Sequence, residues 1–294
     1  MKNGSIKKDV KSLNSQPIEK VLGFCNWLNE QKKQGKKITL VLTGGEPTTY
    51  KHLPDIIEVL DPEIYTVLIS NGSRSVQWWQ NLKRIPDNVI LSTHNETDIG
   101  KIVALGEFLL ARECDVRFNC SMDAEDWDAS VKRYEIIRDK FGNRANRKVI
   151  NALDANGKRK DPQSYTESQR NYLTTQDSTH DTTPEITKLH VAKWKSKTFD
   201  KISLINESDE KEEFNRIYAR NWIIRNDLNH FTGWKCHAGQ ETICVVPSGI
   251  VYAGICGIKL IGDLSNVQLL TEPVICTKST CIEPGDVVIT KYKQ

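Results

Sequence analysis

The alternation of short apolar runs with amphipathic segments between residues 38 and 152 constrains this fold most. Short apolar runs predict buried strands, and apolar residues spaced three and four apart predict helices. The runs that predict strands fall at 38–42, 65–69, 89–91, 115–119 and 148–152. Segments with helical spacing fall at 15–35, 53–60, 75–84, 98–112 and 126–141. Because the two alternate over short connections, we expect an α/β fold on a parallel sheet, either open or closed as part of a barrel.

Small polar residues follow the earlier predicted strands. The carboxyl ends of parallel strands meet at one edge of a sheet, where such folds bind polar ligands. The same residue types also form turns, so a turn-forming role stays open for each position taken alone. Since they recur at successive strand ends, we favour a binding site, with His94 as a further candidate to face it. The residues are Thr43, Ser70, Asn71, Ser92, Thr93, Asn119 and Ser121.

The first of these strand ends carries the sequence Gly44-Gly45-Glu46-Pro47. Paired glycines permit positive φ angles and let a ligand approach bare backbone. Glu46 adds a negative charge beside these backbone groups, and Pro47 stiffens the exit of the turn and removes one backbone donor. The segment therefore reads either as a ligand-binding turn or as a plain strand-to-loop turn.

The charge balance excludes several classes of partner. The chain has 41 basic and 38 acidic residues, a net charge of +3, which predicts neither nucleic-acid nor anionic-membrane binding. No stretch approaches the roughly 20 apolar residues of a membrane span. The first fifteen residues are polar and basic and contain no secretory signal. We expect a cytoplasmic protein, in which eight cysteines favour metal binding or buried thiols over disulfides.

The sequence predicts that the chain is organised in three regions. Residues 1–152 form the α/β region, and residues 153–230 form an insertion and linking segment that is poor in aliphatic side chains up to residue 190. Within that segment we expect a short helix at 165–173, a hairpin at 191–204 and a helix at 207–225. Residues 231–294 form a small cysteine-rich extension.

The extension is predicted to be a β-hairpin that binds a metal. Residues 241–246 and 249–253 alternate around Pro247-Ser248 and would form the hairpin. A hairpin too small for its own core gains stability from a metal, and four thiolates suit zinc or an iron–sulfur cluster. Free buried thiols are the other interpretation, which we prefer for Cys25 on a helix stripe and Cys244 inside a strand. The candidate ligands are Cys236, Cys256, Cys276 and Cys281.

These motifs together resemble the radical S-adenosylmethionine (radical SAM) superfamily. Gly44-Gly45-Glu46-Pro47 after one strand, and Ile69-Ser70-Asn71-Gly72 after the next, are similar to its core. The tail from Gly233 to Gly239, with Ser248 to Tyr252 and the later cysteines, resembles its auxiliary-cluster regions of the SPASM or twitch type. The resemblance covers about residues 15–152 and 231–290.

The resemblance implies a partial (βα)6 TIM-like barrel with the first strand missing. It implies S-adenosylmethionine as cofactor, whose reductive cleavage yields a radical that takes a hydrogen atom from a peptide or small-molecule substrate. The electron would come from a reductant such as a flavodoxin or ferredoxin. The implied cofactor-binding residues are Gly44, Gly45, Glu46, Pro47, Ser70, Asn71, Thr93, Asn119 and Ser121. The implied ligands of a [4Fe–4S] auxiliary cluster, or alternatively zinc, are Cys236, Cys256, Cys276 and Cys281.

The sequence departs from that family at its amino end. The Cys-x3-Cys-x2-Cys loop that would bind the catalytic cluster is missing, and Cys25 is the one cysteine before residue 44. Either the chain begins just past that loop, or the fold has lost its chemistry and serves as a non-catalytic binding module with a structural zinc tail. In both cases we expect that this polypeptide alone does not cleave S-adenosylmethionine reductively. An ordinary nucleotide-binding domain is disfavoured because no glycine-rich phosphate loop is present.

Overall fold

The chain divides into two compact units, which are considered separately. A computed structural model describes residues 16–150, 152–153, 159–160, 165–174, 191–196, 201–206, 211–215, 220, 223–224 and 228–293. Residues Cys25–Thr183 make the first unit, here called the sheet unit. The second, here called the tail unit, combines Met1–Phe24 with Pro184–Gln294.

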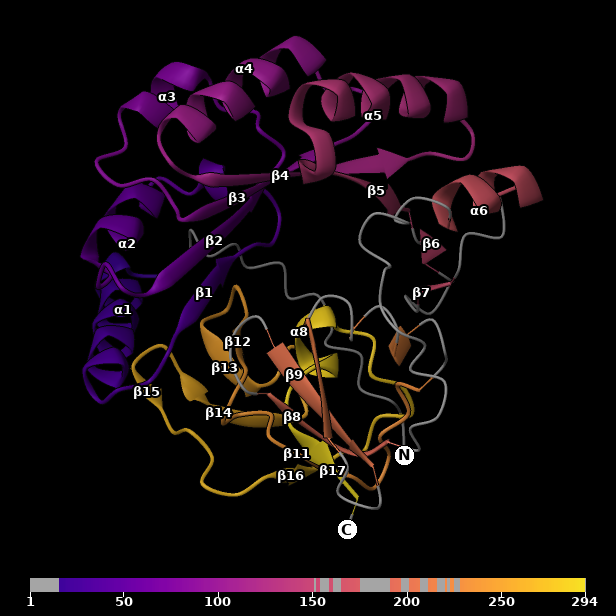
Figure 1. Cartoon of the computed structure of the whole chain (residues 1–294). Coiled ribbons are helices and arrows are strands. Elements are labelled where there is room, and N and C mark those ends of the chain that lie inside the picture. The colour runs from indigo at the N-terminus through magenta and orange to yellow at the C-terminus, as the bar shows by residue number, and fades with distance from the viewer. Residues whose placement is uncertain are drawn as a thin grey trace. The chain divides into compact units, whose positions relative to one another are not determined.

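A parallel sheet with the order β1-β2-β3-β4-β5 forms the centre of the sheet unit (Figure 1). Each strand pairs in parallel with the next one along the chain, which confirms the predicted α/β class. Within the described residues, β1 and β5 are the edges of this sheet. The strands are β1 (Thr39–Leu42), β2 (Tyr65–Ser70), β3 (Asn88–Thr93), β4 (Asp115–Met122) and β5 (Ala145–Val149).

Helices connect these strands, and α3, α4 and α5 lie side by side along one face of the sheet (Figure 1). Their starts follow local capping chemistry. Ser75 accepts a hydrogen bond from the backbone N–H of Trp78 at the start of α3, and Asp98 accepts one from Lys101 at the start of α4. The helices are α1 (Ile18–Lys33), α2 (Leu53–Val59), α3 (Val76–Gln80), α4 (Ile99–Ala111), α5 (Trp127–Phe141) and α6 (Glu167–Thr174), with short 3-10 turns η2 (Pro47–Thr49) and η3 (Gly142–Arg144).

The face of the sheet under the helices carries its core. Alternate residues of a strand point to opposite faces, and residues paired in a parallel ladder share a face. On this rule Leu68, Leu91 and Phe118 share the face that packs against α4 and α5, and each is fully buried. Phe118 stacks on Phe141 of α5 with ring centroids 4.4 Å apart. Cys25 is also buried, as predicted for a small apolar residue of α1.

The fifth strand lies three residues earlier than the prediction of 148–152. Ala145 pairs with Phe118 and is buried, whereas Val149 and Ile150 are 38% and 40% exposed. The short turn η3 directly after α5 brings Ala145 into register with β4. We predicted the strand at 148–152 because Val149 and Ile150 are apolar. The short connection between α5 and β5 instead sets which residues of β5 pair with β4.

A short antiparallel pair, β6 (Ala152–Leu153) with β7 (Arg159–Lys160), follows β5. Beyond it, α6 confirms the short helix predicted at 165–173. Its Tyr172 packs edge-on against Trp127 of α5, with ring centroids 5.5 Å apart. Arg147 of β5 stacks over Tyr172 at 4.1 Å, so aromatic and cation–π contacts hold α6 to the edge of the sheet.

Antiparallel strands dominate the tail unit. A six-stranded sheet has the order β10-β9-β8-β17-β11-β16, and a four-stranded sheet has the order β12-β13-β14-β15. The helix α8 (Pro284–Val287) precedes β17. The strands are β8 (Val191–Ser196), β9 (Lys201–Asn206), β10 (Lys211–Asn215), β11 (Lys235–Cys236), β12 (Ile243–Val245), β13 (Ile250–Ala253), β14 (Lys259–Asp263), β15 (Asn266–Val267), β16 (Val274–Ile275) and β17 (Lys291–Tyr292).

Two predictions for this unit are confirmed and one is wrong. The hairpin expected at 191–204 is β8 with β9, and the hairpin around Pro247-Ser248 is β12 with β13. The helix predicted at 207–225 is wrong at its start, because Lys211–Asn215 is a strand that pairs antiparallel with β9, whereas Arg220, Ile223 and Ile224 are helical. Pairing with the neighbouring strand overrides the local preference for helix. The positions Ile217 and Tyr218 of the expected helical stripe lie outside the described residues.

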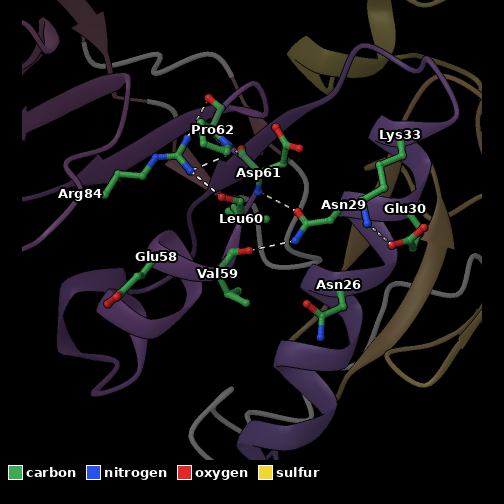
Figure 2. A pocket seen from close by; sticks show the side chains of 10 residues that line it. All are labelled: Asn26, Asn29, Glu30, Lys33, Glu58, Val59, Leu60, Asp61, Pro62 and Arg84. Carbon is green, nitrogen blue, oxygen red and sulfur yellow. Dashed lines mark hydrogen bonds and ion pairs between the residues drawn. The ribbon is translucent and has the colours of Figure 1, made fainter.

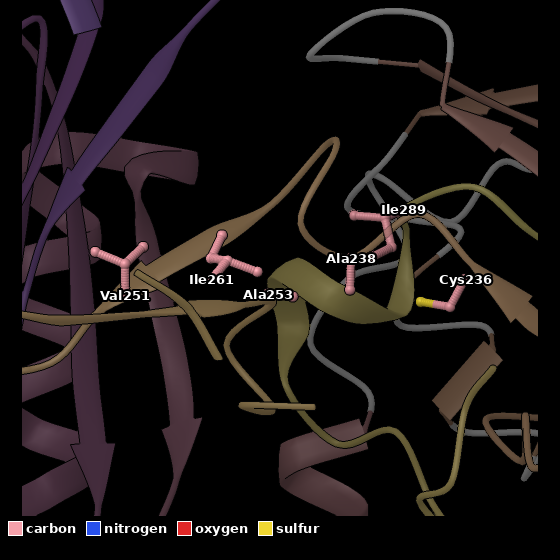
Figure 3. Close-up of a cluster of buried hydrophobic side chains, with 6 residues drawn as sticks. All are labelled: Cys236, Ala238, Val251, Ala253, Ile261 and Ile289. Carbon is pink, nitrogen blue, oxygen red and sulfur yellow. The ribbon is translucent and has the colours of Figure 1, made fainter. Parts of the chain in front are cut away.

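The extension also has a small apolar cluster, which the prediction of a hairpin without its own core did not foresee. It comprises Cys236, Ala238, Val251, Ala253, Ile261 and Ile289 (Figure 3). Residues of β11, β13, β14 and the segment before β17 contribute to it, so it forms only when distant parts of the tail meet.

Among the helices that the structure describes, none has both the length and the apolar character needed to cross a membrane.

Candidate functional site

The Glu46 carboxylate joins the loops that follow β1 and β2. Its Oε1 accepts hydrogen bonds from the Thr48 backbone N–H at 3.1 Å, the Thr48 hydroxyl at 2.6 Å and the Ser70 hydroxyl at 2.8 Å. Its Oε2 accepts one from the Asn71 backbone N–H at 2.7 Å. Since these strands are neighbours in a parallel sheet, their carboxyl ends bring the predicted residues Glu46, Ser70 and Asn71 together.

The two glycines before Glu46 leave their backbone open. A Cβ at Gly44 or Gly45 would meet no atom within 4 Å. Gly44 has φ +138°, in the region that side chains disfavour. The Pro47 ring begins the turn η2, whose first residues are held by Glu46. The glycine pair thus presents bare peptide groups beside a carboxylate.

These loops line a cavity of about 680 Å³. This volume lies in the range of small-molecule sites, roughly 300–1,000 Å³. The predicted residues that line it are Thr43, Gly44, Gly45, Glu46, Ser70, Asn71 and Ser92, and the further candidate His94 lines it as well. Other lining residues include Glu96, Thr97, Asp98, Lys101 and Lys148.

The structure does not bring the remaining predicted residues to this cavity. Thr93 is fully buried, and it pairs with Cys120 in the ladder between β3 and β4. Alternation along β3 therefore turns Ser92 and His94 toward the cavity and Thr93 away from it. Asn119 and Ser121 share the face of β4 opposite the helices, and neither is among the lining residues.

Some lining residues escaped the sequence argument. Lys148 was expected to begin a strand; with β5 shifted, its side chain lies near the carboxyl end of the sheet and lines the cavity. Asp98 and Lys101 belong to the first turn of α4 and form an ion pair of 3.7 Å. The N-cap position of Asp98 was a usable signal, since it marks a helix start at the end of a strand.

A second cavity, of about 440 Å³, lies between α1 and the end of α2 (Figure 2). Asn29 donates to the Val59 carbonyl and accepts from the Asp61 backbone N–H, and Arg84 donates to the Leu60 carbonyl at 2.8 Å. These polar groups tie the helix ends together, so we assign this cavity a structural role.

In the tail unit, hydrogen bonds of both backbone and side-chain groups hold the segments that carry the four candidate cysteine ligands. Cys276 accepts from Gly233 and donates to Trp234, close to Cys236 of β11. Cys281 exchanges hydrogen bonds with Asn229. The Cys256 backbone N–H donates to Asp286 of α8 at 2.6 Å.

The thiols of this region influence one another electrostatically. Burial raises the pKa of Cys281 to about 12, the Lys291 charge opposes this shift, and Cys236 and Cys276 add to it. Burial also raises the pKa of Cys236 and of Cys256, with the Asp286 carboxylate adding to the second shift. All eight cysteines are free of disulfides.

The donor type of these thiols suits zinc or an iron–sulfur centre. Their placement does not amount to a formed site. Among the residues that the structure describes, no group of three or more His, Cys, Asp or Glu side chains lies close enough together to hold a metal ion. The predicted ligands therefore share a region of the tail without converging on a common point.

No protein-family model matches the chain, and no curated protein matches it either. The resemblance to the radical SAM superfamily therefore depends on the sequence motifs quoted above alone.

Proposed function

We propose that this chain is a radical SAM protein whose parallel sheet is part of a (βα)6 barrel and whose strand-end cavity binds S-adenosylmethionine. The observation that carries the proposal is the Glu46 carboxylate, which fastens two strand-end loops beside open glycine backbone and a cavity of about 680 Å³. A zwitterionic amino-acid group matches this combination, since peptide carbonyls and a carboxylate attract an ammonium group.

The chain's residues would bind and orient this ligand. Gly44 and Gly45 offer carbonyl oxygens at close range, and Glu46 keeps their turn fixed through its bonds to Ser70 and Asn71. When bound, the cofactor supplies radical chemistry, and the protein contributes orientation and exclusion of water. In this proposal Ser92 and His94 contribute from the end of β3, and the predicted Thr93 does not.

We further propose that this polypeptide alone does not cleave the cofactor, because its sequence holds no Cys-x3-Cys-x2-Cys motif for a catalytic cluster. Incubation of reconstituted protein with S-adenosylmethionine and a strong reductant tests this. Formation of 5′-deoxyadenosine above the protein-free background would overturn it.

For the tail we propose a metal centre at Cys236, Cys256, Cys276 and Cys281. An auxiliary [4Fe–4S] cluster would fit an enzyme that acts on a peptide or small molecule with a flavodoxin or ferredoxin as reductant. A structural zinc would fit the alternative, a non-catalytic binding module. Metal analysis and the visible spectrum of anaerobically purified protein separate the two, since a cluster is brown and zinc is colourless.

Calorimetric titration with S-adenosylmethionine and S-adenosylhomocysteine tests the cavity directly. Glu46→Gln places an amide N–H against the Asn71 N–H and should weaken binding at least tenfold. Glu96→Gln is a matched control, because it removes another carboxylate from the same cavity without touching that network. Equal affinities for Glu46→Gln and the wild type would contradict the proposed site.

A further inference from the structure

Residues 94–98, the segment that follows β3, form one wall of the cavity. His94, Glu96, Thr97 and Asp98 line it. Asn95 is the one residue of this segment that does not line the cavity. The turn is held locally, since the His94 N–H donates to the Thr97 hydroxyl at 2.8 Å and the Thr97 N–H donates to the His94 carbonyl at 3.1 Å.

Asn95 is held from behind the wall by two groups of opposite charge. Its Oδ1 accepts a hydrogen bond from Arg133 of α5 at 2.6 Å, and its Nδ2 donates to Asp123 after β4 at 3.0 Å. An amide is suited to this place because it presents an acceptor to the cation and a donor to the anion.

The network closes on itself through Ser130. The Ser130 hydroxyl is fully buried; it accepts from Arg133 at 3.1 Å and from the Asp123 backbone N–H at 3.0 Å. Four side chains thus join the wall segment, the end of β4 and α5. Closed polar networks of this kind hold their members in one arrangement more firmly than single bonds do.

The burial of Arg133 costs free energy that a purely structural role does not account for. It is 6% exposed, it has no carboxylate within ion-pair distance among the described residues, and its Nε has no hydrogen-bond partner there. Burying a guanidinium without a direct counter-charge is unfavourable. Its hydrogen bonds go instead to Ser130 and to Asn95, the residue behind the cavity wall.

We propose that Arg133 is a positioning residue for the cavity: acting through Asn95, it sets the place of the wall formed by residues 94–98. This inference rests on the proposed binding function of the cavity. Arg133 itself does not line the cavity, so it touches no ligand there. Arg133 instead fixes the position at which His94 and its neighbours would contact a ligand.

The test compares Arg133→Lys, Arg133→Met and Asn95→Ala, alone and as the double variant of the last two. Arg138→Met is the matched control, because Arg138 is exposed on the same helix and stacks on Tyr134. We measure S-adenosylhomocysteine affinity, hydrogen exchange of the His94 and Thr97 amides, and the melting temperature. Asn95 is exposed, so its variant should fold even if Arg133→Met does not.

We expect Asn95→Ala and Arg133→Met each to weaken binding about tenfold and to speed exchange of both amides, with no further loss in the double variant. Arg133→Lys should recover part of the affinity. Unchanged exchange and affinity with a lower melting temperature would overturn the inference and leave Arg133 a structural residue. If the wild type binds no ligand, the proposed function fails, and the exchange data alone decide whether Arg133 positions the wall.

Discussion

In the sheet unit the polar groups of the candidate site already bond to one another, whereas in the tail unit the thiols approach without converging. Glu46 accepts four hydrogen bonds that join two loops. The tail cysteines share only a region, and no described group of three side chains is placed to hold a metal. Parallel topology by itself places strand-end residues at one edge of the sheet. Thiol ligands converge on a common point only when the binding free energy of a metal ion stabilises that arrangement.

The hydrophobic cores of the sheet unit and the tail unit also differ, in the size of their buried side chains. The sheet unit buries large side chains such as Trp79, Leu91 and Phe118 completely. The tail cluster in Figure 3 relies in part on small residues, including Ala238, Ala253 and Cys236. Because apolar stabilisation scales with buried area, we expect the tail to depend more on a bound ligand than the sheet does.

The largest expected effect is the loss of a core ring from the sheet unit. Phe118→Ala removes a fully buried ring stacked on Phe141 and should lower the free energy of unfolding by about 3–5 kcal/mol. Urea denaturation followed by circular dichroism measures this. Phe108→Ala, at a half-buried position of α4, is the control and should cost clearly less. Equal costs would contradict the view that this core stabilises the sheet.

The next effect tests the dependence of the tail on metal. If the four thiols bind a metal, a free concentration of about 100 Kd should stabilise the folded tail by roughly 2.7 kcal/mol. Thermal unfolding with and without zinc, or after iron and sulfide reconstitution, measures the shift. Cys236→Ser should abolish it and Cys244→Ser should retain it. A full shift in Cys236→Ser would remove the thiol region from consideration as a metal site.

A smaller effect on stability is expected at Glu46. Glu46→Gln leaves the Asn71 N–H facing an amide donor and should cost about 1–3 kcal/mol. Glu46→Asp keeps the charge on a shorter side chain and serves as the comparison. Denaturant unfolding of both variants beside Glu96→Gln measures the cost. A loss confined to ligand affinity, with stability unchanged, would show that the network adds nothing to the fold.

The smallest effect at neutral pH concerns the buried thiols of the sheet unit. Burial raises the pKa of Cys25 and Cys114 to about 12 and of Cys120 to about 11, above roughly 8.5 for an exposed thiol. A raised thiol pKa gives stability that is complete below the unfolded value and lost as pH rises through the folded value. The sheet should therefore weaken between about pH 9 and 12.

Alkylation by iodoacetamide, mapped by mass spectrometry, checks this site by site. All three thiols should react slowly at pH 8 in the folded protein and at the normal rate in urea. Rapid modification of folded Cys120 at pH 8 would contradict its burial.

Much of the sheet could be predicted from the sequence. The helical spacing in α4 and α5, and the polar ends of β1 and β2, give the alternation and place Glu46, Ser70 and Asn71 at one edge. The prediction failed where pairing with a neighbouring strand sets the structure. The strand β5 begins three residues early because a short turn fixes its register with β4. Residues of β10 form a strand because they pair with β9.

The sequence by itself determined the α/β class, the glycine–carboxylate turn and the crowding of cysteines in the tail, because periodicity, turn chemistry and composition are local properties. Only the tertiary structure decided that His94 rather than Thr93 meets the cavity, and that Arg133 reaches Asn95 from behind its wall. Which face a residue takes depends on register, and which helix meets which loop depends on packing. Both are set by partners distant along the chain.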